Sequence, residues 1–123
     1  VGQRQRGGQP DAGYGARRRH LLMEQARQYL ETHYRECVAL DDVAKALRVS
    51  PYHLSHVFSE QSDFSLFAYL TSLRLGKARE LLREGRLNVS EVAYAVGYQD
   101  PNYFAKVFRK HFGKAPREAA GRG

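Results

Sequence analysis

The sequence predicts an all-α fold in which two helix-turn-helix subdomains are joined by a long central helix. Three observations support this prediction. Apolar residues recur at spacings of three and four, a pattern of two short helices about a turn occurs twice, and one longer helical pattern lies between the two copies. We expect the first helix-turn-helix at about 40–61, the connecting helix at about 65–84 and the second helix-turn-helix at about 88–112.

The composition bounds what the chain can be. It has 123 residues, of which 42% are hydrophobic, enough for one domain with a modest core. The single cysteine, Cys37, excludes an internal disulfide and favours a reducing compartment. No apolar run is long enough to span a bilayer and no signal-peptide pattern opens the chain, so we expect a cytoplasmic protein.

The net charge is +7, and its distribution is informative. Residues 1–20 hold five Arg against one acid, and residues 89–123 hold six basic residues against three acids. Residues 40–62, in contrast, hold two basic residues and three acids. Basic charge favours a nucleic acid or an anionic membrane surface as partner. The helix-turn-helix pattern selects nucleic acid.

The N-terminal part divides into two segments. Residues 1–16 are rich in Gly, Gln and Arg, which predicts a disordered tail or linker. The folded domain is expected to comprise residues 17–120. The basic cluster at 17–20 has two interpretations: contacts to phosphates, or a solvated charge run at a helix start, which is the commoner case. From about Arg17 to His33, apolar residues at helical spacing predict an amphipathic helix, namely Leu22, Ala26, Tyr29 and Leu30.

The first helix-turn-helix follows this helix. Asp41 and Asp42 suit the positive end of a helix dipole, and Val43, Ala44 and Leu47 form an apolar face behind them. Ser50-Pro51 then restarts a helix with a capping residue and a proline at the first helical position. The inward face of that second helix is expected to carry Leu54, Val57 and Phe58.

The connecting helix is expected to begin after Ser65 and to end at Gly85. Its apolar stripe is Leu66, Tyr69, Leu70, Leu73, Ala78, Leu81 and Leu82. Residues 66–84 would span roughly 28 Å at the helical rise per residue. Such a rod suits two recognition helices held about one DNA turn apart, roughly 34 Å. The aromatic residues Phe64, Phe67, Tyr69, Phe104 and Phe108 are expected to be core.

The second helix-turn-helix repeats the first. Gly97 can enter the left-handed conformation of the turn, and Asp100-Pro101 caps and starts the next helix. The paired positions of the first helices and turns are Val43/Val92, Ala44/Ala93, Leu47/Val96 and Val49/Tyr98. Those of the second helices are Pro51/Pro101, Leu54/Phe104, Val57/Val107 and Phe58/Phe108. The recurrence indicates a duplicated module in which the second turn is longer.

Residues 39–116 resemble the DNA-binding domain of AraC/XylS-family transcriptional regulators. The most specific part of the match is Val92-Ala93, Val96-Gly97-Tyr98, Asp100-Pro101-Asn102-Tyr103-Phe104, Phe108, Gly113 and Pro116, and the connecting helix contributes Arg74, Ala78, Leu81 and Leu82. The resemblance implies a seven-helix domain that binds adjacent major-groove segments of bacterial promoter DNA. It also implies a nucleoid-associated activator that contacts RNA polymerase, and an effector-binding or dimerisation domain on the N-terminal side. The chain begins with Val rather than Met, which fits a fragment that lacks such a domain.

The chain departs from the family pattern in three places. Arg48 stands where the family usually has Gly, so we expect the first turn to be strained or differently shaped. Asp63 replaces a Gly after the first recognition helix. Ala119-Ala120 stand where an aromatic residue and Arg are usual, which implies either a poorly anchored last helix or final residues that are not native.

The resemblance also assigns site residues. The positions that would approach base edges are Tyr52, Ser55 and His56 in the first recognition helix, and Asn102, Tyr103, Ala105 and Lys106 in the second. Asn can bond adenine, Lys can donate to guanine, and Ala or an aromatic edge can meet a thymine methyl. The residues expected to contact phosphates are Arg48, Arg109, Lys110 and Lys114, joined by backbone N–H groups near Asp41 and Asn88.

Other functions are less well supported. His53 and His56 lie three apart, but structural zinc needs about four ligands, so protonation of these histidines in the groove is the better hypothesis. We expect no metal, no cofactor and no catalytic residue, because the sequence shows no nucleophile–base pair and no phosphate-cradling glycine loop. The alternative to a sequence-specific regulator is a protein-interaction or weakly specific DNA-binding module.

Overall fold

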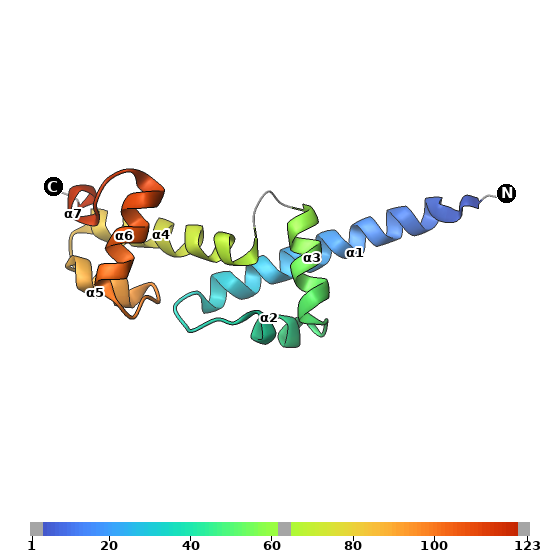
Figure 1. The fold of residues 1–123 in the computed structure, drawn as a ribbon, viewed down its shortest axis with the longest axis horizontal. Coiled ribbons are helices and arrows are strands. Elements are labelled where there is room, and N and C mark those ends of the chain that lie inside the picture. The colour runs from blue at the N-terminus through green and yellow to red at the C-terminus, as the bar shows by residue number, and fades with distance from the viewer. Residues whose placement is uncertain (1–3, 62–64, 121–123) are drawn as a thin grey trace. The chain divides into compact units, whose positions relative to one another are not determined.

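The computed structural model describes residues 4–61 and 65–120, with side chains described for residues 15–60 and 65–120. The described residues form α1 (Arg4–His33), α2 (Leu40–Leu47), α3 (Pro51–Gln61), α4 (Leu66–Glu84), α5 (Val89–Ala95), α6 (Pro101–Phe112) and α7 (Pro116–Ala119) (Figure 1). No strand occurs in these two ranges, and the all-α fold class is confirmed. None of the helices described has both the length and the apolar character needed to cross a membrane.

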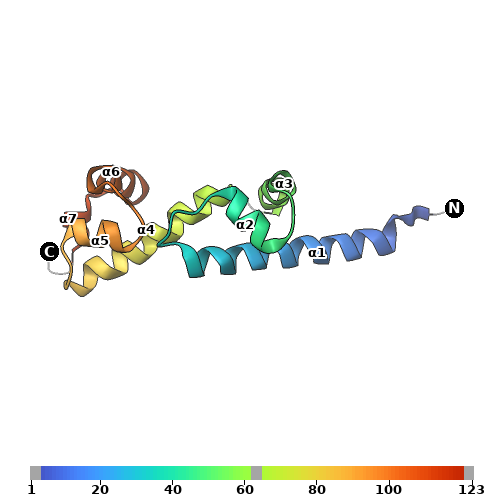
Figure 2. The same ribbon diagram turned by 90° about the horizontal axis from the view of Figure 1, so that it is seen from below.

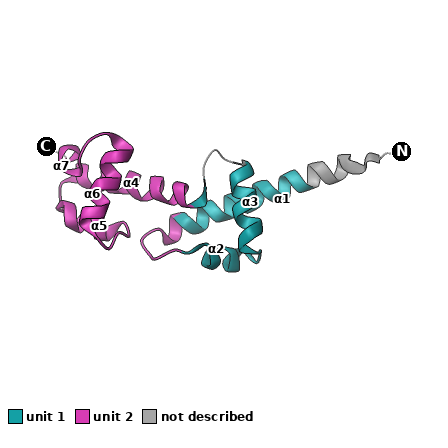
Figure 3. Cartoon of the chain, viewed as in Figure 1, with its two compact units in different colours: residues 1–30, 39–66 teal, residues 31–38, 67–123 magenta. Residues whose placement is uncertain are grey.

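The chain divides into two compact units (Figure 3). Unit 1 contains residues 1–30 and 39–66, and unit 2 contains residues 31–38 and 67–123. The helix-turn-helix α2–α3 lies in unit 1, whereas α4 from its second residue, α5, α6 and α7 lie in unit 2. Each helix-turn-helix therefore belongs to its own unit.

The core of unit 1 forms between α1 and the first helix-turn-helix. Its buried side chains are Leu22, Met23, Ala26 and Leu30 from α1, Val43 and Ala44 from α2, and Leu54, Val57 and Phe58 from α3, with Leu66 beside them in the same unit. The predicted inward faces of α2 and α3 are thus confirmed, except that Leu47 is only half-buried. Met23 was missed because it adjoins Leu22 on a stripe wider than expected.

The core of unit 2 is rich in aromatic rings. Tyr98, Phe104 and Phe108 are buried, and their ring centroids follow one another at 5.4 Å and 5.7 Å, with Phe112 4.7 Å beyond Phe108. Around them lie the buried residues Tyr34, Leu70, Leu75, Ala78, Leu82, Val92, Ala93, Val96 and Pro116. Figure 2 shows α5, α6 and α7 gathered about the second half of α4. Burial of Pro116 at the start of α7 anchors the last described helix.

The two helix-turn-helix turns share one backbone pattern. The carbonyl of Ala44 accepts from the N–H of Val49 at 3.0 Å, and the equivalent carbonyl of Ala93 accepts from the N–H of Tyr98 at 2.9 Å. A second bond closes each turn, from Arg48 N to Lys45 O at 3.1 Å and from Gly97 N to Tyr94 O at 3.2 Å. These paired bonds define the Schellman motif, which needs a positive φ at its closing residue.

That residue is Arg48 in the first turn and Gly97 in the second, with φ values of 61° and 106°. Arg48 is the one non-glycine with positive φ among the described residues. The expected strain in the first turn is therefore confirmed, and the turn keeps the shape of its partner. The structure accommodates the missing glycine by forcing Arg48 into the left-handed region.

The remaining sequence expectations differ in outcome. Helix α1 begins at Arg4, and the disordered tail or linker expected at 1–16 stays a prediction. Phe67 was expected in the core but is 43% exposed, because the buried Leu66 and Leu70 set the inward face of this turn and Phe67 projects to one side of it. Asp63 and Phe64 lie outside the described residues.

Candidate nucleic-acid interface

The first recognition helix, α3, starts where the sequence predicts. The Ser50 hydroxyl accepts a hydrogen bond from the N–H of His53 at 3.0 Å, which caps the helix, and Pro51 occupies the first helical position. With Leu54, Val57 and Phe58 buried beneath, the outer face of α3 is left open. The three predicted base-contacting residues all lie there: Tyr52, which is 78% exposed, Ser55 and His56.

Two of these side chains, Tyr52 and His56, contact each other, and His56 also contacts Glu60. The rings of Tyr52 and His56 stack with centroids 5.7 Å apart and planes within 11°, and His56 Nε2 lies 3.2 Å from Glu60 Oε2. Tyr52, His56 and Glu60 thus form a ridge at intervals of four residues along α3. Glu60 was not among the predicted site residues, although its spacing of four residues from His56 indicated that the two side chains could meet. A nearby phosphate would repel its carboxylate.

The second recognition helix, α6, is capped in the same way. The Asp100 carboxylate accepts from the N–H of Asn102 at 2.9 Å, with Pro101 at the first helical position. Asn102, Tyr103 and Lys106 are exposed, while Phe104 and Phe108 on the opposite face are fully buried. The structure therefore places these three of the four predicted base-contacting residues on one outward face. Ala105 is half-buried between the two faces.

The predicted phosphate contacts follow at the end of α6. Arg109 and Lys110 lie in its last turn and are exposed, and Lys114 is exposed just beyond Gly113, whose φ of 83° ends the helix. Within the described part of the chain, these three side chains form no ion pair. Their charge is thus available to an anion. In unit 1 the residue predicted to contact a phosphate, Arg48, is also exposed.

The backbone N–H groups at the helix starts are partly occupied. Asn88 accepts from the N–H of Glu91 at 2.8 Å, and Glu91 accepts in return from the N–H of Asn88 at 2.9 Å. At the start of α2, Asp42 accepts from the N–H of Ala39 at 3.2 Å. These capping bonds occupy backbone N–H groups near Asp41 and Asn88, the donors that were predicted to contact DNA phosphates.

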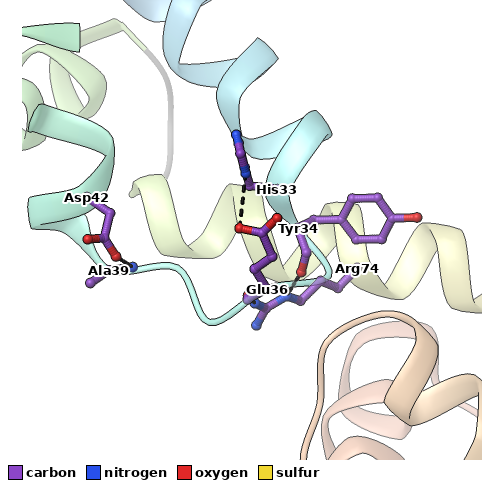
Figure 4. Close-up of polar contacts among 6 residues, drawn as sticks. All are labelled: His33, Tyr34, Glu36, Ala39, Asp42 and Arg74. Carbon is purple, nitrogen blue, oxygen red and sulfur yellow. Dashed lines mark hydrogen bonds and ion pairs between the residues drawn. The ribbon is translucent and has the colours of Figure 1, made fainter. Parts of the chain in front are cut away.

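A polar clamp lies behind the second turn. Arg74 of α4 donates from Nε to the carbonyl of Tyr34 and from a terminal nitrogen to the carbonyl of Glu36, both at 2.8 Å (Figure 4). Partial burial lowers the pKa of its guanidinium. The guanidinium also lies 5.6 Å from the centroid of the Tyr98 ring, and burial raises the pKa of the Tyr98 hydroxyl. Arg74 thus ties the segment after α1 to the turn that positions α6.

Metal ligands do not gather on this surface. In the described ranges, no three His, Cys, Asp or Glu side chains are close enough together to hold a metal ion. His53 and His56 are both exposed on α3, and His56 is engaged by Glu60. What the outer faces of α3 and α6 offer chemically is a set of hydrogen-bond donors, acceptors and aromatic edges, bordered by cations.

Known proteins share both the sequence and the fold. Residues 43–122 match the family model described as a helix-turn-helix domain. An uncharacterised HTH-type transcriptional regulator of Escherichia coli K12, YijO, is 38% identical over 103 residues, covering 84% of this chain and 36% of YijO. The HTH-type transcriptional activator RhaS of E. coli SE11 is 37% identical over 90 residues, covering 73% of this chain and 32% of RhaS. The chain spans about a third of the length of these curated relatives.

Solved structures of transcriptional regulators have the same fold as this chain. The C-terminal domain of AraT, a response regulator from Geobacillus stearothermophilus, aligns with a TM-score of 0.77 and 35% identity, covering 82% of this chain and 84% of that one. A transcriptional regulator from Chromobacterium violaceum with an AraC-type DNA-binding domain aligns with a TM-score of 0.79 and 26% identity, covering 84% of this chain and 92% of that one. The paired turns, the exposed faces of α3 and α6 and these relatives lead to one assignment: the chain belongs to the AraC/XylS family and forms its helix-turn-helix DNA-binding domain.

Proposed function

We propose that this domain reads two adjacent major-groove segments of a promoter, with α3 in one and α6 in the other. The observation that supports this most directly is the doubled arrangement of a capped helix with a buried apolar face and an exposed polar face. An α-helix fits the major groove, where each base pair shows a distinct pattern of donors and acceptors. The protein acts by binding and needs no catalytic step.

The proposed base contacts follow from side-chain chemistry. Asn102 would bond the edge of an adenine, Lys106 would donate to a guanine, and Tyr103 would meet a thymine methyl. In the first unit, Tyr52, Ser55 and His56 would supply the equivalent contacts. Phosphates on either side would be held by Arg48, Arg109, Lys110 and Lys114, which fix the register on the duplex without reading sequence.

The role in transcription is inferred from relatives. RhaS is named as an activator, and activation requires contact with the transcription machinery, so RNA polymerase is the proposed second partner. An effector-binding or dimerisation domain is proposed as a further part of the whole regulator. Its place of action is then the bacterial cytoplasm, at the nucleoid.

Selection of bound sequences from random duplexes tests the proposal. We expect two short preferred blocks with centres about one helical turn apart, roughly 34 Å. The double variant Y52A/H56A should lose the preference in one block, and N102A/K106A should lose it in the other. A single block that neither variant alters would contradict reading by two helices.

A second candidate function is a protein-interaction module with weak DNA specificity. The observation in its favour is the acidic first unit, where residues 40–62 hold more acids than bases and Glu60 lies on the exposed ridge of α3. Gel shifts with a selected duplex and excess competitor DNA separate the two functions. Retention against the competitor indicates a sequence-specific regulator, and complete loss to it indicates the second function.

A further inference from the structure

A cleft in unit 1 collects basic side chains from three elements. Its walls include Arg18 and Arg19 from α1, Arg48 from the turn between α2 and α3, and His53 from the first turn of α3. The cleft has a volume of about 480 Å³. Arg18, Arg48 and His53 are exposed at its rim, and Arg19 is half-buried. Residues separated by about thirty positions in the sequence thus meet at one site.

The charges in this cleft are of one sign. Three of its lining side chains are guanidiniums, and no Asp or Glu is among the described residues that line it. A phosphate group carries the opposite charge and is attracted to guanidiniums that are gathered in this way. Gly15 lies beside Arg19: a Cβ there would approach Arg19 Nη1 to 3.3 Å, so the absence of a side chain leaves room for the guanidinium.

Arg48 adds an independent argument. Its left-handed conformation costs an ordinary residue roughly 1–2 kcal/mol, which a glycine at the same position would avoid. Residues held in such conformations concentrate where their side chains have a function. The strain is borne here by a long cationic side chain that lines the cleft and directly follows α2.

We infer that Arg18, Arg19 and Arg48 together bind one backbone phosphate of the DNA, next to the segment that α3 reads. This rests on the proposed function, because α3 must enter the groove for the cleft to meet the backbone. Guanidiniums are well suited to the partner, since their planar fork bonds two phosphate oxygens at once. The contact enlarges the interface by recruiting α1, which lies outside the helix-turn-helix, and it offsets the acidic character of residues 40–62.

The test compares R18A, R19A and the double variant R18A/R19A with the parent on a selected duplex over a range of salt concentrations. Each single substitution should weaken binding uniformly across sequences, and the double variant should weaken it about tenfold and reduce the slope of log K against log salt by about one. R17A is the matched control: it removes the same charge from the neighbouring position, but Arg17 does not line the cleft. Circular dichroism confirms that each variant is folded.

Single methylphosphonate substitutions along the duplex identify the source of the phosphate. At one flanking position the neutral linkage should weaken binding by the parent and by R17A, yet cause no further loss in R18A/R19A. Titration with inorganic phosphate is the second arm: binding there without any coupled DNA position would assign the cleft to a free phosphoryl ligand and overturn the inference. If the parent retains the duplex and R18A/R19A behaves as R17A does, the inference fails alone. If the parent retains no duplex, the proposed function fails.

Discussion

Gly97 and Arg48 hold equivalent positions in two turns of the same hydrogen-bond pattern, but they face different surroundings. A Cβ at Gly97 would lie 2.7 Å from the carbonyl oxygen of Tyr34 and 3.1 Å from Nε of Arg74. The glycine is therefore required twice, by its φ of 106° and by the backbone that passes over it. Arg48, with an exposed side chain, has only the conformational cost to bear.

The substitution Gly97→Ala should therefore be more damaging than the same change at another positive-φ glycine. We expect it to lower the free energy of unfolding of unit 2 by more than about 2 kcal/mol, since the collision adds to the left-handed cost. Gly85 is the matched control, because it has a φ of 75° but open space around its Cβ position. Urea denaturation followed by circular dichroism measures both; equal losses would show that the Tyr34 backbone yields without cost.

At the first turn, a substitution is expected to raise the free energy of unfolding rather than lower it. Arg48→Gly should raise the free energy of unfolding of unit 1 by about 1 kcal/mol, because it relieves the left-handed strain. It should at the same time weaken DNA binding, since the cation that borders α3 is lost. Arg48→Ala, measured in parallel, should weaken DNA binding without the gain in stability. If Arg48→Gly binds DNA as the parent does, Arg48 makes no phosphate contact.

Tyr98 predicts a pH dependence. Burial raises the pKa of its hydroxyl in the folded state, against the opposing effect of the Arg74 guanidinium. The folded state therefore keeps a proton that the unfolded chain loses above about pH 10, so this contribution to stability is present below that pH and falls as the pH rises through the folded pKa. In Tyr98→Phe the decline of unfolding free energy between pH 9 and pH 11 should be smaller than in the parent. Equal declines would mean that other groups control it.

At the scale of residues, the sequence identifies local chemistry best. The capping roles of Ser50 and Asp100 were predictable because each acts on a backbone N–H a few positions away. The strain at Arg48 was predictable from the family pattern, which usually has Gly at that position. The collision that fixes Gly97 was not, because Tyr34 comes from a segment far away in the chain.

At the scale of elements, α4 organises unit 2 through Arg74. The carbonyls of Tyr34 and Glu36 follow the end of α1, where helical partners run out, and Arg74 supplies donors for both. A planar guanidinium can reach two carbonyls in fixed geometry, which an ammonium cannot do. The clamp holds the segment after α1 against the turn that precedes α6.

We expect Arg74→Ala to lower the free energy of unfolding of unit 2 by about 2–3 kcal/mol, the scale of hydrogen bonds to a charged group, reduced for partial exposure. Arg74→Lys should recover only part of this loss. Arg83→Ala, at the exposed end of the same helix, is the control and should stay within about 0.5 kcal/mol of the parent. Hydrogen exchange at residues 34–38 locates the effect: unchanged protection there would argue against the clamp.

The element boundaries were largely predictable, whereas the buried face of α4 was not. The predicted connecting helix agrees with the observed Leu66–Glu84, because Gly85 closes it with bonds to the carbonyls of Leu81 and Leu82. Leu75 is fully buried but was missed, since it follows the buried Leu70 by five positions and so lies off a single stripe. One helical period cannot describe a helix whose buried face turns along its length.

At the scale of the whole molecule, sequence and structure agree on which residues face outward. Every predicted base-contacting residue except the half-buried Ala105 is exposed, because a capped helix with a fixed apolar face leaves only one side open to solvent. The cationic cleft of unit 1 could not be predicted from the sequence. The basic cluster at 17–20 was visible there, but its proximity to Arg48 and His53 depends on the fold. Which side chain meets which base stays a prediction, since donors and acceptors acquire partners only on the duplex.

The distribution of basic residues predicts how DNA binding depends on salt concentration. Lys106, Arg109 and Lys110 stand on the exposed side of α6 and form no ion pair within the described residues, so each can release a counterion from DNA. The triple variant K106A/R109A/K110A should reduce the slope of log K against log salt by about two to three. The charge-matched variant K77A/R83A/R86A should change it by less than about one, because those residues lie on or just after α4 and not on the recognition helix. Equal effects of the two variants would mean that net charge, rather than the face of α6, attracts the duplex. An unchanged slope in the first variant would place the phosphate contacts in unit 1, where Arg18, Arg19 and Arg48 would then carry them.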